Sequence, residues 1–107
     1  MNQDINRLLM ELERSMRLIN REAINPAIQE LTIDGLRPVL CLVANARARY
    51  LRALFDLGAS AEDGRPTEAQ LDELATLRRE YSELTEAARA LETAIQRGYL
   101  DVQPSAR

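Results

Sequence analysis

The sequence predicts an all-α protein made of three long helices. Apolar residues recur at alternating intervals of four and three along most of the chain, which is the period of one helix face. Proline and glycine mark two internal stretches, residues 25–35 and 58–66, which separate the periodic segments. No run of alternating apolar and polar residues predicts a strand. We therefore expect antiparallel helices at about 3–24, 33–57 and 67–97, with a short helical or kinked segment at 26–31.

A single row of apolar residues, spaced 4, 3, 4, 3 and 4 apart, predicts the first helix. This spacing is a heptad seam, the pattern of helices that pack side by side. We call the row the first-helix seam; it consists of Ile5, Leu9, Leu12, Met16, Ile19 and Ala23. Three other apolar residues of this helix lie off the seam, and together with one aromatic residue of the second helix they are our candidate oligomer interface. These candidates are Met10, Leu18, Ile24 and Phe55.

The connection after the first helix is predicted to interrupt the helical pattern. Proline lacks a backbone N–H and pushes the residue before it out of the helical region, so Asn25-Pro26 ends or kinks the first helix. Two interpretations of residues 26–31 are open, a separate short helix or the kinked end of the first one. Thr32 or Asp34 is expected to cap the start of the second helix.

The second helix is the most apolar part of the chain, and its apolar side covers more than half of its circumference. A helix of this kind has to be covered from more than one side. We expect the first and third helices to provide that cover, together with a second subunit. Gly58 suits the left-handed position just past a helix end, so this helix is predicted to stop at Leu57.

A capping box predicts the start of the third helix, because Thr67 is followed three residues later by Gln70. A further heptad seam runs along this helix, and Gly98 is expected to end it in the left-handed conformation. The chain is predicted to form one helical domain over residues 1–100, followed by a flexible tail at 101–107.

Composition excludes several classes of function. The chain has 107 residues and a formal net charge of −3, which argues against a protein whose main task is to bind nucleic acid. Histidine is absent and there is one cysteine, so histidine-dependent catalytic units are excluded, and we predict no metal and no other cofactor. The longest unbroken apolar run is too short to span a bilayer, and the N-terminal segment does not resemble a signal peptide, so no membrane association and a cytoplasmic location are expected.

All 14 basic residues are arginine. We interpret this bias as the codon usage of a GC-rich bacterial genome; the alternative is selective recognition of anions by planar guanidinium groups.

Arg47 is the most unusual residue, because the helical projection places it on the apolar side of the second helix. A buried guanidinium needs a partner. Three interpretations are open: a contact within the chain, for which Glu80 is the preferred partner, a pair across a subunit interface, or an anion site. The candidate interaction or anion site comprises Arg47, Arg49, Arg52, Tyr50, Glu80 and Tyr81.

The missing catalytic residues and the surplus of apolar helix surface favour a non-enzymatic protein–protein interaction module, such as an adaptor, chaperone or regulator of a bacterium. The same surplus predicts a homodimer, built as a helical bundle or coiled coil, that binds a further protein partner. The alternative is a small-anion binding protein or enzyme that uses the arginines of the second helix. In size and acidic helical composition the chain resembles the bacterial export chaperones of flagellar and type III substrates, a resemblance that no specific motif carries.

Overall fold

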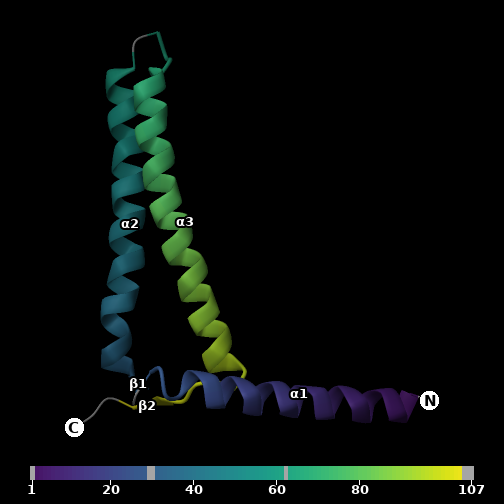
Figure 1. Cartoon of the computed structure of the whole chain (residues 1–107). Helices are drawn as coiled ribbons and strands as arrows, with labels where there is room; N and C mark the ends of the chain where they lie inside the picture. Colours follow the sequence, from purple (N-terminus) through teal and green to yellow (C-terminus); the bar gives the residue numbers. More distant parts are fainter. Residues whose placement is uncertain (1, 29–30, 62, 105–107) are drawn as a thin grey trace. The chain divides into compact units, whose positions relative to one another are not determined.

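The three predicted helices are present in the structure, a computed structural model that describes residues 2–28, 31–61 and 63–104. Two strands of two residues each accompany them, so the fold is all-α apart from one short strand pair (Figure 1). In chain order the elements are α1 (Asn2–Ile24), β1 (Leu31–Thr32), α2 (Ile33–Ser60), α3 (Glu68–Gln96) and β2 (Val102–Gln103).

These elements belong to two compact units. The hairpin unit is Arg37–Ala90, which is continuous in sequence and contains most of α2 and α3. The terminal unit combines Met1–Leu36 with Leu91–Arg107, and so joins α1 and β1 to the last residues of α3 and to β2. The hairpin unit is therefore an insertion between the two segments of the terminal unit.

In the hairpin unit, side chains from the middle of α2 meet side chains from the middle of α3. The rings of Tyr50 and Tyr81 stack with their centroids 5.9 Å apart. Nearer the turn, Leu57 and Leu74 line the same shallow groove, which holds about 210 Å³. The two helices of this unit therefore run in opposite directions. Only a small side chain, that of Ala46, is fully buried among the residues described in this unit.

The turn between α2 and α3 confirms one sequence-based prediction and corrects another. The Thr67 and Gln70 side chains each accept a hydrogen bond from the other residue's backbone N–H, at 3.1 and 2.8 Å, which is the predicted capping box. Gly58, by contrast, does not end α2, which continues to Ser60. The left-handed backbone lies further on, at Asp63 and Gly64, with φ of 55° and 72°. The turn geometry is supplied there, so Gly58 stays helical.

The connection after α1 contains a turn and a strand. The carbonyl oxygen of Ile24 accepts hydrogen bonds from the backbone N–H groups of Ala27 and Ile28, at 2.9 and 3.0 Å. Residues 29–30 of the predicted 26–31 segment lie outside the described residues, and Leu31 is in β1. Thr32 then caps α2 as expected, because its Oγ1 accepts a hydrogen bond from the backbone N–H of Gly35 at 3.0 Å.

β1 pairs in parallel with β2, and the register is Leu31 with Val102 and Thr32 with Gln103. The sequence predicts neither strand, because a two-residue strand is too short to show alternation. Part of the segment 101–107, expected to be a flexible tail, is therefore paired in the structure: Val102–Gln103 belong to the strand pair.

Gly98 ends α3 in the predicted way, with φ of 74°. The backbone N–H of Tyr99 donates to the carbonyl of Ala94 at 2.8 Å, and that of Gly98 donates to Ile95 at 3.2 Å. This pair of bonds is the Schellman motif, which satisfies carbonyl groups at the helix end. The chain then turns back, and the side chain of Leu100 is buried at 3% exposure, beside the helix end that Ala94 belongs to.

Candidate functional site

Arg47, Tyr50 and Tyr81 form one cluster in the middle of the hairpin unit. The Arg47 guanidinium carbon lies 5.4 Å from the centre of the Tyr81 ring, a cation–π geometry. Its Nε also donates a hydrogen bond to the Tyr81 hydroxyl at 3.3 Å. Tyr81 thus contacts both the Tyr50 ring and the Arg47 guanidinium, and Arg47 itself stays exposed.

The prediction that Glu80 is the partner of Arg47 is wrong, because Glu80 forms its ion pair with Arg49. The reason is the direction of each side chain. Arg47 and Arg49 are two positions apart on α2 and therefore point to different sides of it, as do the adjacent Glu80 and Tyr81 on α3. One side of the hairpin brings Arg47 to Tyr81, and the other brings Arg49 to Glu80.

Arg52 does not join this cluster. Its Nε lies 3.3 Å from an oxygen of Asp56, one turn along the same helix, and both side chains are exposed. Arg49 and Arg52 each face a carboxylate and Arg47 faces an aromatic ring, so the three arginines do not converge on a common space. This arrangement gives no support to the alternative of an anion site on α2.

The charge of Arg47 changes the acidity of Tyr81. The hydrogen bond from Arg47 and its positive charge stabilise the phenolate, and they lower the pKa of Tyr81 below its usual value near 10. The remaining hydrogen-bonding nitrogens of Arg47 make no ion pair within residues 2–28, 31–61 and 63–104. They are available to a group from outside the hairpin unit.

In the terminal unit, two arginines of α1 bind the end of α3, and sequence reasoning missed both. Arg17 Nε donates to the carbonyl of Arg97 at 3.4 Å, and Arg21 Nη1 donates to that of Gly98 at 2.8 Å. Cations suit a helix C-terminus, where unpaired carbonyls carry partial negative charge. No local pattern in the sequence identifies them, because the groups they bind lie about 80 residues away.

Arg21 also holds the segment after α3 through a forked ion pair. Its two terminal nitrogens donate to the two carboxylate oxygens of Asp101, at 3.1 and 2.8 Å. The Arg21 guanidinium lowers the pKa of Asp101, so this carboxyl keeps its negative charge to a lower pH than usual. Asp101, assigned by the sequence to the tail, is therefore a contact of α1.

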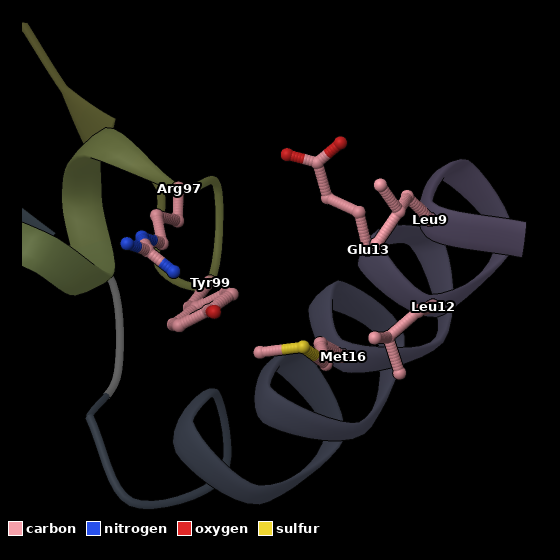
Figure 2. A pocket seen from close by; sticks show the side chains of 6 residues that line it. All are labelled: Leu9, Leu12, Glu13, Met16, Arg97 and Tyr99. Atoms are coloured by element: carbon pink, nitrogen blue, oxygen red, sulfur yellow. The ribbon is translucent and has the colours of Figure 1, made fainter. Parts of the chain in front are cut away.

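The first-helix seam lines an open groove in the terminal unit. Leu9, Leu12 and Met16 form one wall, and Tyr99 forms part of the other; the groove holds about 280 Å³. Figure 2 shows the Met16 side chain directed toward the Tyr99 ring, and the Glu13 carboxylate extending from α1 toward the side where Arg97 lies.

The residues predicted to form an oligomer interface are mostly exposed. The exposed fractions are 65% for Met10, 57% for Leu18 and 75% for Phe55, and Ile24 is half-buried. The first-helix seam is exposed as well, although it was expected to be covered: α1 contains no buried residue. The structure thus presents apolar side chains on both sides of α1.

Comparison with known protein families, with curated proteins and with solved structures gives no match for this chain.

Two further findings concern metal binding and membrane spans. Within the part of the chain that the structure describes, no three histidine, cysteine, aspartate or glutamate residues are grouped so that they could hold a metal ion. In the same residues, no helix is long and apolar enough to cross a membrane.

Proposed function

We propose that this protein is a non-enzymatic helical interaction module, an adaptor, chaperone or regulator that binds another protein through the first-helix seam. A partner's amphipathic helix would pack against the seam with matching heptad spacing. The polar groups around the groove would orient that partner, and the apolar residues would supply most of the binding free energy.

One observation carries this proposal: the exposure of the first-helix seam. Four of its large side chains, those of Ile5, Leu9, Leu12 and Ile19, expose between 54% and 64% of their surface. Single exposed apolar residues are common on proteins, but a continuous row at heptad spacing marks a helix that packs against another helix.

Capture from lysate of the native host tests the proposal. The wild-type chain is compared with Leu9→Ser/Leu12→Ser, which places two hydroxyl groups in the seam, and with Met10→Ser/Leu18→Ser, which makes the same chemical change on the other side of α1. We expect the seam variant to lose the partner, and the matched control to retain it. Circular dichroism checks that both variants keep their helical content.

The proposal fails if the wild-type chain captures no reproducible protein, the host's own copy of the chain included. It fails equally if the seam variant captures the same proteins in the same amounts while its helical content is intact.

A further inference from the structure

We propose that a second copy of this chain binds the first-helix seam: α1 of each copy packs against an exposed apolar row of α2 in the other, and the contact is made twice in a two-fold dimer. This inference rests on the proposed function, because it names a partner for the same surface of α1.

The receiving surface is a second row of residues at heptad spacing, along an exposed side of α2 whose middle position, Arg47, borders α3 through its contact with Tyr81. We call this row the second-helix seam; it consists of Leu40, Ala44, Arg47, Leu51 and Leu54, spaced 4, 3, 4 and 3 apart. Its three leucines expose 63%, 47% and 54% of their surface. Tyr50, which stacks on Tyr81 of α3, is not a member of this row, and its neighbour Arg47 lies at the border between the two sides. Two helices whose seams share this spacing pack with the side chains of one between those of the other.

Opposite charges on the two seams would favour packing of the first-helix seam against the second-helix seam. The second-helix seam has a single charged residue, Arg47, at its middle position. The first-helix seam has an acidic residue, Glu13, next to its middle position at Leu12. Because both charges lie midway along their seams, they meet whichever way the two helices run.

Both charged groups are also without an ion-pair partner in the described residues. Arg47 contacts Tyr81 through its Nε and one face of its guanidinium, which leaves its terminal nitrogens for a carboxylate. The Glu13 carboxylate extends into the groove of the terminal unit, beside the apolar side chains that would pack on α2 (Figure 2). A charge-assisted pair at this place would fix the alignment of the two helices.

The reciprocal contact also explains why both seams are exposed in one chain. A different protein bound to α1 alone would leave the second-helix seam in water. In a two-fold dimer one contact, repeated by symmetry, covers both seams of both copies.

Exchange of the two charges tests the inference. Glu13→Arg and Arg47→Glu each place like charges together at both contacts of the dimer. We expect each single variant to raise the dimer dissociation constant by about tenfold or more, measured by sedimentation and light scattering against the 12.1 kDa mass of one chain. The two variants mixed in equal amounts should form a heterodimer about as tight as the wild type, since each contact then joins an arginine to a glutamate.

Glu11→Arg and Arg52→Glu are the matched controls, because they make the same charge changes on the same helices away from the two seams. They should leave the dissociation constant within about threefold of the wild-type value. Circular dichroism of each variant separates a loss of helix from a loss of pairing, and Glu13→Gln with Arg47→Gln replaces the reversals if either one unfolds.

A wild-type chain that stays monomeric at all concentrations overturns the inference, as does a dimer that both reversals leave unchanged. If a chain carrying both Glu13→Arg and Arg47→Glu regains the wild-type free energy of unfolding but the mixture of single variants does not pair, the contact lies within one chain and the inference is again wrong. In each of these cases capture of a different protein by the first-helix seam would still support the proposed function.

Discussion

At the scale of single residues, Arg47 acts on Tyr81 by its charge and by direct contact. The hydrogen bond to the hydroxyl and the position over the ring both hold the guanidinium on the exposed side of α2. The protonated phenol contributes through the ring and the hydrogen bond, and ionisation of Tyr81 adds an attraction between opposite charges.

The sign of this pH dependence follows from the lowered pKa. A group whose pKa is lower in the folded state stabilises the fold fully above its unfolded pKa, here near 10. That contribution is lost as the pH falls through the folded pKa. We expect Arg47→Met to raise the pKa of Tyr81 toward its usual value, measured from the tyrosine carbon signals in an NMR titration.

Arg49→Met is the control for this titration, because Arg49 pairs with Glu80 and does not contact the Tyr81 hydroxyl. This substitution should leave the pKa of Tyr81 at its wild-type value. A pKa that is the same in the wild type and in Arg47→Met would contradict the assignment of the shift to Arg47.

At the scale of elements, the sequence predicts most of what is local. The three helices appear within a few residues of the expected bounds, because apolar residues recur on one side along most of each helix. The start of α3 is equally predictable, since Thr67 and Gln70 act on the backbone of their own turn. Glycine is a less reliable sign of a helix end. Gly58 and Gly98 each come just after an apolar helical segment, yet of these two only Gly98 has left-handed backbone.

This difference between the two glycines predicts opposite effects of alanine. Gly98→Ala forces a side chain into left-handed backbone and should lower the free energy of unfolding by about 1–2 kcal/mol. Gly58→Ala adds a methyl group inside α2, where no atom lies within 4 Å, and should raise it by about 0.5–1 kcal/mol. Denaturant unfolding of the two variants beside the wild type measures both changes. Equal signs for the two substitutions would contradict the helix ends described above.

Contacts between distant segments are what sequence reasoning could not provide. The choice of Glu80 for Arg47 fails because it uses the level along the helix and not the side that each residue faces. The binding of Arg21 to Gly98 and Asp101, and the pairing of β1 with β2, join segments about 70–80 residues apart. Nothing in either segment alone indicates its partner. Of the candidate residues, Arg47, Tyr50 and Tyr81 lie together and Arg52 lies apart, and the sequence did not predict which of them pair.

At the scale of the whole molecule, the proposed dimer links stability to protein concentration. If association covers both seams, a tenfold increase in chain concentration should stabilise the folded dimer by about 1.4 kcal/mol. We therefore expect the unfolding midpoint to rise with concentration in the wild type and to be independent of it in Leu9→Ser/Leu12→Ser. Thermal unfolding followed by circular dichroism over a wide concentration range measures this. A wild-type midpoint that does not move would argue that folding and association are separate.

The discontinuous terminal unit has a consequence for the growing chain on the ribosome. α1 is made early, but the groups that its arginines bind, at residues 97–101, are made only after the entire hairpin unit. The hairpin unit is continuous, so it needs no later residue to pair its two helices. Throughout that interval the first-helix seam is in water, and on a messenger carrying several ribosomes it lies near identical nascent chains. If the proposed dimer forms, slow elongation after the second-helix seam has been made prolongs the time in which the first-helix seam of one nascent chain can meet the second-helix seam of another before either chain is complete.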